Sequence, residues 1–208
     1  PGPAPVLDRA SLTRGRDEPE AYSPDADWMP SVVLVAKNAY VWLDQLSRWT
    51  GREVRRLDEV PDEALAELSG HGFTGLWLIG LWERSQASAR IKRLRGQEDA
   101  VASAYALWDY RIANDLGGED AWRTLRDRAW RHGIRLAADM VPNHVGIDGR
   151  WVVEHPERFL SLPHPPYPGY AFTGPDLSGD DRIEVRIEDG YWESRDAAVV
   201  FERIDRAS

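Results

Sequence analysis

The chain has 208 residues, a formal net charge of −9 and no cysteine. The lack of cysteine excludes a disulfide framework, thiolate catalysis and Cys-ligated metal sites. The surplus of 35 acidic over 26 basic residues disfavours general nucleic-acid binding. No apolar run approaches the roughly 18 residues that a transmembrane helix needs, so neither nucleic acid nor a membrane is expected as a partner. The chain opens with no basic or apolar leader segment, and this, with the lack of cysteine, favours the cytoplasm.

Proline divides the chain into three stretches. Six of the 14 prolines fall in residues 1–30 and seven fall between Pro142 and Pro175. Proline removes a backbone donor and fixes φ, so regular structure is expected between these two regions. Residues 1–30 are therefore predicted to be a proline-rich extension or linker.

The middle stretch alternates strand and helix patterns. Short apolar runs predict buried strands, and apolar residues at helical spacing predict helices. The predicted strands are Val32–Ala36, Leu76–Ile79 and Ile134–Val141, and the predicted helices are Pro61–Ser69, Ala87–Leu94 and Glu119–His132. This order indicates an α/β fold built from parallel βαβ units, and it fits either an open doubly wound sheet or the beginning of a barrel.

The pattern changes after residue 145. Residues 163–168 are rich in proline and are expected to form a loop. Arg182–Glu188 alternates charged and apolar residues, which predicts a strand, and Asp189-Gly190 predicts a hairpin turn after it. Ala198–Phe201 is a candidate for a further strand.

Polar residues follow the third predicted strand. Asp139, Asn143 and His144 stand where ligands bind in parallel α/β folds, at the carboxyl ends of the strands. Together they offer acceptors and donors that suit a polyhydroxylated ligand. A helix-capping aspartate, an asparagine turn and a surface histidine would give the same pattern, and the spacing alone does not separate the two interpretations.

Four segments in chain order carry a family resemblance. Asp139-x-x-x-Asn143-His144 resembles the first characteristic region of the α-amylase family, glycoside hydrolase family 13. Three further segments resemble its earlier landmarks: Thr74–Leu78, Tyr105–Tyr110 and Leu116–Glu119. The resemblance implies a partial TIM (β/α)8 barrel. Residues 31–145 would supply its first three βα units, and residues 146–208 would begin the β-rich excursion called domain B.

The resemblance also assigns roles by position. Tyr105 matches an aromatic on which a sugar ring stacks, and His144 matches a residue that hydrogen-bonds a sugar hydroxyl. Asp139 matches an aspartate of the active-site polar network, and Asp109 matches a structural acid. Asn143 matches a calcium ligand of many members. No cofactor is required, although calcium is possible, with further oxygens available from Asp148, Asp176, Asp180 and Asp181.

The residues that perform the family's chemistry are not found in the sequence. Retaining glycosidases use two carboxyl groups, which in this family follow the fourth and fifth barrel strands. Only three barrel-type strands are predicted, so the chain is expected to be the N-terminal fragment of a starch-, glycogen- or maltooligosaccharide-active glycosidase or transglycosidase. Its expected partners are an α-glucan and the remainder of the same barrel, and the 208 residues alone are expected to be inactive.

Two other functions remain open. One is a non-catalytic carbohydrate-binding or degenerate barrel protein. The other is a hydrolase on a different α/β fold with Asp139 and His144 as metal ligands, although His155 and His164 stand in proline-rich segments and supply no usual ligand spacing.

Aromatic and basic residues complete the candidates. Trp82, Trp108, Trp151 and Trp192 stand in or near predicted loops and are candidates for lining a sugar cleft. Trp77 and Trp122 are expected to be packed in the core. The basic run Arg90–Arg95 is expected to be a solvated helix face.

Overall fold

A computed structural model of the protein describes residues 28–194 and 200–206. The chain divides into two compact units, Pro1–Val33 and Leu34–Ser208. The proline-rich segment predicted for residues 1–30 lies mostly outside the described residues. In the first unit the structure describes one short 3-10 helix, η1 (Met29–Ser31).

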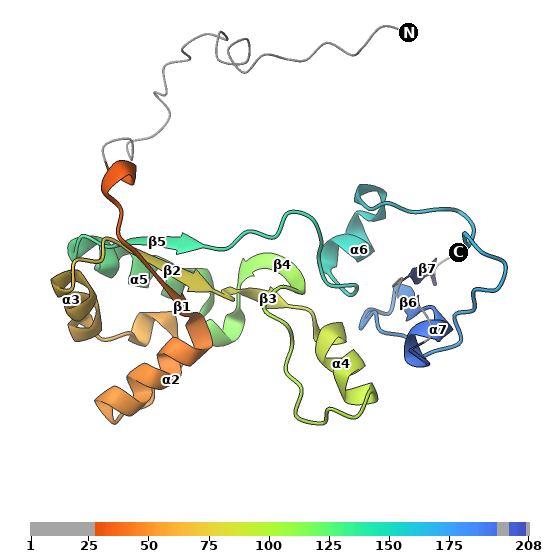
Figure 1. The fold of residues 1–208 in the computed structure, drawn as a ribbon, viewed down its shortest axis with the longest axis horizontal. Helices are drawn as coiled ribbons and strands as arrows, with labels where there is room; N and C mark the ends of the chain where they lie inside the picture. The colour runs from red at the N-terminus through yellow and green to blue at the C-terminus, as the bar shows by residue number, and fades with distance from the viewer. Residues whose placement is uncertain (1–27, 195–199, 207–208) are drawn as a thin grey trace, which may run out of the picture. The chain divides into compact units, whose positions relative to one another are not determined.

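The second unit contains a three-stranded parallel sheet in the order β1-β2-β5, formed by β1 (Leu34–Asn38), β2 (Gly75–Ile79) and β5 (Arg135–Ala138) (Figure 1). The register pairs Ala36 with Trp77 and Trp77 with Ala137. The helices that connect these strands are α2 (Ala39–Thr50), α3 (Asp62–Gly70) and α5 (Gly118–Arg131), with short 3-10 helices η2 (Leu57–Glu59) and η3 (Asn114–Leu116). The predicted α/β fold with a parallel sheet is confirmed.

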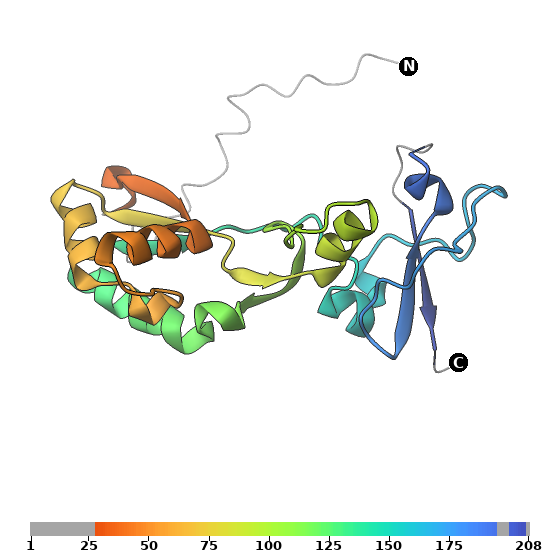
Figure 2. The same ribbon diagram turned by 90° about the horizontal axis from the view of Figure 1, so that it is seen from below.

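One face of the sheet carries the main hydrophobic core. Leu76 and Leu78 of β2 are fully buried against residues of the three connecting helices, among them Leu43, Leu65 and Leu125. Figure 2 shows α2, α3 and α5 on the same side of the sheet. The apolar stripes of these helices therefore cover this face, as amphipathic packing requires.

The opposite face of the sheet is not covered in the same way. One row across it is formed by Ala36, Trp77 and Ala137. Ala36 is exposed, and the other two residues are half-buried. The prediction that Trp77 packs in the core is wrong, because its neighbours Leu76 and Leu78 take the core-facing positions. Trp122 packs against the core as expected. The prediction of a buried first strand is also wrong, since Leu34 of β1 is 47 % exposed.

An antiparallel pair of strands and a helix separate β2 from α5. The strands β3 (Trp82–Arg84) and β4 (Leu107–Ile112) pair in antiparallel register, and α4 (Gln86–Leu94) lies between them in sequence. The sequence predicts this helix but not the two strands. Their pairing is irregular, with register shifts on both sides of Glu83.

The segment after residue 145 contains both loops and short elements. These are α6 (Arg150–Glu154), η4 (Pro156–Arg158), β6 (Ile183–Ile187), α7 (Asp189–Trp192) and β7 (Phe201–Asp205). Strands β6 and β7 pair in antiparallel register, which confirms the predicted strand at 182–188. The predicted turn at Asp189-Gly190 is wrong, because the Glu188 carboxylate accepts a hydrogen bond from the Gly190 amide and caps α7 there. Of the strand predicted at 198–201, residues 198 and 199 lie outside the described residues.

None of the helices in residues 28–194 and 200–206 is both long and apolar enough to cross a membrane.

Candidate functional site

Asp139 joins the ends of two neighbouring parallel strands. It follows β5, and its Oδ1 accepts a hydrogen bond of 3.2 Å from the amide of Gly80, which follows β2. The Asp139 carbonyl accepts a second bond of 2.8 Å from the indole Nε1 of Trp82. Gly80 has a φ of +80°, a left-handed conformation that favours glycine. Asp139 is therefore fixed at the carboxyl edge of the sheet, where parallel α/β folds bind ligands.

The second carboxylate oxygen of Asp139 accepts no hydrogen bond from the described residues. The residue is only 8 % exposed, and its Oδ2 has no hydrogen-bond partner among the residues that the structure describes. A buried carboxylate oxygen without a donor is costly. This oxygen is thus enclosed, and none of the described residues donates a hydrogen bond to it.

Arg84 connects three segments at this edge. Its Nη2 donates to the Gly80 carbonyl at 3.2 Å and its Nη1 donates to the Ala102 carbonyl at 3.3 Å. The guanidinium also lies 4.4 Å from the ring centroid of Tyr40, the second residue of α2. The Tyr40 hydroxyl donates to Asp115 at 2.8 Å, and burial together with this acidic partner raises the pKa of Tyr40. Neither Arg84 nor Tyr40 is predicted from the sequence, because no local pattern marks an arginine whose partners are distant in sequence.

The segments that carry Tyr105 and His144 meet through their backbones. The Gly146 amide donates to the Leu107 carbonyl at 2.7 Å. Gly146 stands two residues after His144, and Leu107 stands two residues after Tyr105. The Ser85 amide donates to the Ala106 carbonyl, also at 2.7 Å. Tyr105 is 52 % exposed, and His144 is exposed with its Nδ1 3.0 Å from Asn143 Oδ1. Both side chains are accessible to a ligand.

Asp109 of β4 pairs with an arginine of α6. Its side chain is 4 % exposed, and its Oδ2 lies 3.1 Å from Arg150 Nη1 of α6, an ion pair whose geometry is not that of a hydrogen bond. Its Oδ1 accepts a bond of 2.9 Å from the Tyr110 amide. The pair links β4 to α6, and Asp109 has no exposed oxygen for a ligand.

Aromatic side chains hold the chain that follows Asp139. The Tyr110 hydroxyl accepts a bond of 2.8 Å from the Val141 amide. The Tyr110 ring lies edge-on to Trp82 with centroids 5.3 Å apart, and its centroid is 6.1 Å from that of Trp151. Trp82 and Trp151 thus support the segment that leads to Asn143 and His144.

The carboxylates suggested for calcium are engaged elsewhere. Asp148 accepts a bond of 2.9 Å from the Ala87 amide in the first turn of α4. Asp176 accepts from the amides of Ser178 and Val185, and Arg182 holds Asp180 by two hydrogen bonds. Within residues 28–194 and 200–206, no group of three or more His, Asp or Glu side chains fits a metal ion. These acids therefore do not form a ligand set, and calcium at Asn143 stays a prediction.

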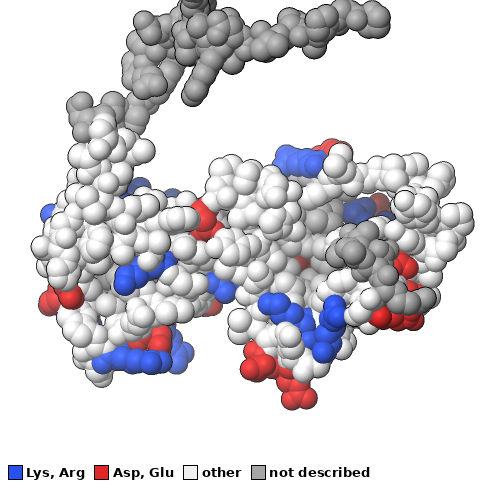
Figure 3. Space-filling view, in the orientation of Figure 1, with Lys and Arg blue, Asp and Glu red and all other residues white. Residues whose placement is uncertain are grey.

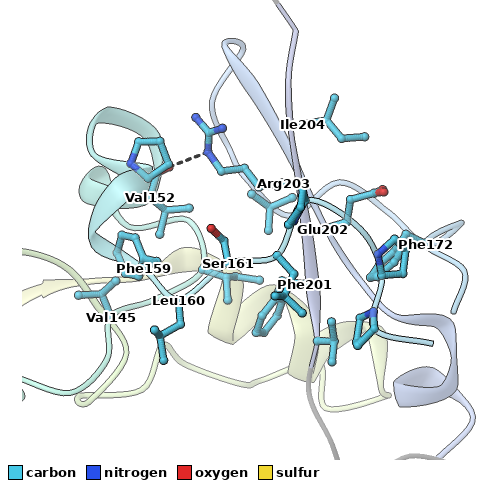
Figure 4. Close-up of a pocket in the computed structure, with 18 of the residues that line it drawn as sticks. Val145, Val152, Phe159, Leu160, Ser161, Phe172, Phe201, Glu202, Arg203 and Ile204 are labelled. Atoms are coloured by element: carbon cyan, nitrogen blue, oxygen red, sulfur yellow. Dashed lines mark hydrogen bonds between the residues drawn. The ribbon is translucent and has the colours of Figure 1, made fainter.

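An open groove of about 1010 Å³ adjoins His144. Figure 4 shows Val145, Phe159 and Leu160 on one side of it and Phe201 and Phe172 toward the other. The Arg203 guanidinium donates to the Val152 carbonyl at 2.8 Å and ties β7 to α6 at the groove. His144 and Asn143 thus line a mainly apolar groove, which is also lined by Val185 of β6 and by residues 201–204 of β7.

The basic cluster behaves as a solvated helix face. Figure 3 shows Lys and Arg side chains gathered over α4, with acidic side chains beside them. Arg90, Lys92, Arg93 and Arg95 are exposed, and Arg95 donates to the Ser194 hydroxyl at 3.0 Å. Trp192, which was a candidate for the sugar cleft, packs edge-on against Tyr191 in a small second cluster.

No family model matches the chain, and a search of curated proteins finds no match. Solved structures of α-amylase-family enzymes are similar to it. A maltogenic α-amylase of Thermotoga neapolitana matches at 21 % identity and a TM-score of 0.48, over 64 % of this chain and 28 % of that one. An α-amylase of Geobacillus thermoleovorans complexed with acarbose matches at 20 % identity and a TM-score of 0.37, over 62 % of this chain and 26 % of that one.

Eubacterium rectale Amy13B matches at 18 % identity and a TM-score of 0.35, over 50 % of this chain and 18 % of that one. The chain therefore spans at most 28 % of the length of these three structures. Since every TM-score is below 0.5, the function proposed below rests on the residues of this chain.

Proposed function

We propose that this chain is the N-terminal part of a retaining, α-glucan-active glycoside hydrolase or transglycosidase of the α-amylase type, and that alone it is inactive. The observation that carries the proposal is the link between Asp139 and Gly80 at the carboxyl ends of β5 and β2. Close by in the chain, the segments of Tyr105 and His144 meet at the Leu107–Gly146 hydrogen bond. Asp139 and His144 lie on the segment that follows β5, and Tyr105 lies just before β4, so these two hydrogen bonds connect the segments of all three residues.

In this proposal the sheet is the first part of a barrel. Strands β1, β2 and β5 would be the first three of eight parallel strands. The face with Ala36, Trp77 and Ala137 would turn toward the barrel interior, and α2, α3 and α5 would belong to the outer ring. The β6–β7 hairpin with α6 would begin domain B.

The side chains of this part would bind and orient the glucan. The exposed ring of Tyr105 offers a face on which a pyranose stacks, and His144 offers a ring nitrogen to a sugar hydroxyl. Asp139 would fix the strand ends through its bond to the Gly80 amide, and its buried Oδ2 would accept from a donor of the remaining barrel. Asp109 would keep a structural role through its pair with Arg150.

The bond-breaking groups would come from the rest of the protein. One carboxylate attacks the anomeric carbon, while a second carboxyl group protonates the departing glycosidic oxygen. Water or a sugar hydroxyl then displaces the enzyme carboxylate, and the configuration is retained. In this reaction, the part of the chain that the structure describes would position the sugar ring.

The proposal is tested with the complete protein and a maltooligosaccharide. Tyr105→Ala removes the stacking face, and we expect kcat/KM to fall about tenfold, which corresponds to about 1.4 kcal/mol. Tyr105→Phe keeps the ring and serves as the matched control, with activity near that of the wild type. Equal activity of the alanine variant and the wild type would refute the role of Tyr105. Sugar binding without any turnover would favour a non-catalytic carbohydrate-binding protein.

A further inference from the structure

The guanidinium of Arg84 bonds two backbone carbonyls that belong to different segments. Arg84 is the last residue of β3 and is half-buried. Its Nη2 donates to Gly80, just after β2, and its Nη1 donates to Ala102, in the loop between α4 and β4. Arginine can bridge two acceptors in this way because its planar fork carries several donors at fixed spacing. The side chain therefore fixes the end of β2 relative to this loop.

The first of these bonds leads to Asp139. The Gly80 carbonyl accepts from Arg84, and the Gly80 amide donates to Asp139 Oδ1 at 3.2 Å. A Cβ on Gly80 would lie 2.7 Å from Arg84 Nη2, so the guanidinium packs directly on the Gly80 backbone. Removal of the guanidinium would therefore release one side of the residue that anchors Asp139.

The second bond leads to Tyr105, which stands three residues after Ala102. Hydrogen bonds continue along the chain between them. The Ser103 amide donates to Ser88 Oγ at 3.0 Å, and the Tyr105 amide donates to Ser103 Oγ at 3.3 Å. Because Tyr105 is 52 % exposed, packing of its own ring holds this segment only weakly. The position of the segment depends instead on hydrogen bonds such as the one from Arg84.

A ring contact fixes the direction of the guanidinium. The Arg84 guanidinium lies 4.4 Å from the ring centroid of Tyr40 in α2, and the Tyr40 hydroxyl donates to Asp115 of η3 at 2.8 Å. An arginine plane is stabilised over an aromatic ring in a way that a lysine ammonium does not reproduce together with a two-carbonyl bridge. The two donors of Arg84 are therefore aimed at their carbonyls before a ligand arrives.

We propose that Arg84 is a positioning residue of the glycosidase site, which holds Gly80 and Asp139 at a fixed place relative to the loop that presents Tyr105. The inference rests on the proposed function and deepens it. Arg84 acts through these two segments and does not touch the sugar. Since a small displacement of a substrate-positioning group lowers a rate strongly, loss of the bridge lowers turnover.

The first test measures kcat/KM of the complete protein on a maltooligosaccharide. Arg84→Ala is expected to lower kcat/KM at least tenfold. In a Tyr105→Ala background the same change should cost only about threefold, because the loop then has no ring to present. An equal loss in the two backgrounds, or wild-type kcat/KM for Arg84→Ala, would overturn the inference.

Two further variants separate positioning from charge and from stability. Arg84→Lys keeps the positive charge, but one ammonium group cannot replace the fork, so kcat/KM should still fall severalfold. Full activity of this variant would contradict the bridge. The matched control is Arg128→Ala, which removes a half-buried arginine of α5 that bonds the Asp58 carbonyl at 3.0 Å and the Asp62 carboxylate. It should lower the melting temperature but keep kcat/KM within twofold, and a loss as large as that of Arg84→Ala would overturn the inference.

Hydrogen exchange tests the contact without any glucan. Arg84→Ala should speed exchange at the amides of residues 103–106 at least tenfold and leave the amides of α3 and α5 unchanged. Unchanged exchange at residues 103–106 would overturn the inference. If the complete wild-type protein cleaves no glucan, the proposed function fails, whereas the exchange result still decides whether Arg84 holds the Tyr105 segment.

Discussion

Gly146 occupies a position that has no room for a side chain. A Cβ there would overlap the side chain of Ser85 and come within 3.0 Å of the Leu107 carbonyl oxygen. That oxygen accepts a hydrogen bond of 2.7 Å from the Gly146 amide, and this bond joins the segments of Tyr105 and His144. The φ of Gly146 is not in the left-handed region. Glycine is therefore required here by the close approach of Ser85 and Leu107, and not by the backbone conformation.

Gly146→Ala should therefore destabilise the protein. We expect the free energy of unfolding to fall by about 1–3 kcal/mol, because an added methyl forces well-packed neighbours to move. Denaturant unfolding of the complete protein measures the change. The control is Gly70→Ala, where the added Cβ has open space and the change should stay within about 0.5 kcal/mol. Similar losses for the two variants would contradict the close approach.

Individual ligand-binding candidates can be predicted from the sequence, but the residues that hold them in place cannot. Asp139 and His144 could be named because they follow a recognisable strand in a motif with fixed spacing. Arg84 could not be named, since its partners Gly80, Ala102 and Tyr40 lie outside any local pattern. The close packing of Gly146 on Ser85 depends in the same way on the folded chain.

Helix α2 illustrates how a single element was missed. It contains Tyr40, Val41, Trp42 and Trp49, which are poor or middling helix formers, so its composition does not indicate a helix. Burial of Trp42, Leu43 and Leu46 against the sheet stabilises it instead. The flanking signals were nevertheless present: Asn38 caps its first turn, and Gly51 ends it with a φ of +67°.

The cap of α2 gives a direct test of this account. The Asn38 side chain accepts a bond of 3.2 Å from the Val41 amide. Asn38→Ala leaves that donor without its partner and should cost about 1 kcal/mol of unfolding free energy. Asn38→Ser keeps a capping oxygen and should recover most of the loss. Thermal or urea unfolding of the complete protein compares the three proteins, and an alanine variant as stable as the wild type would show that the cap contributes nothing.

Elements with strong amphipathic patterns were predicted within a few residues. The helices at 61–69 and 119–132 correspond to α3 and α5, and the three parallel strands to β1, β2 and β5. Neither β3 nor α6 is predicted from the sequence, because Trp82–Arg84 and Arg150–Glu154 are too short to show a period. Their positions depend on contacts such as the Asp109–Arg150 pair.

In the part of the chain that the structure describes, the parallel sheet has two outer edges and one face that the core helices do not cover. Among the described residues no strand pairs with the outer edges of β1 and β5. Leu34 is 47 % exposed, and the helices of the core do not cover the row formed by Ala36, Trp77 and Ala137. Open strand edges promote aggregation unless something covers them. The remaining strands of a barrel would pair with both edges and bury this face.

The most direct test of this account compares glucan cleavage by the complete protein and by the 208-residue chain produced alone. The assay follows new reducing ends from a maltooligosaccharide and the anomeric configuration of the product. We predict cleavage or transfer with retention by the complete protein, and no turnover above a blank by the 208-residue chain, which should also fail to behave as a monodisperse, cooperatively melting monomer. Turnover by the 208-residue chain, or a complete protein that neither binds nor cleaves α-glucans, would contradict the account.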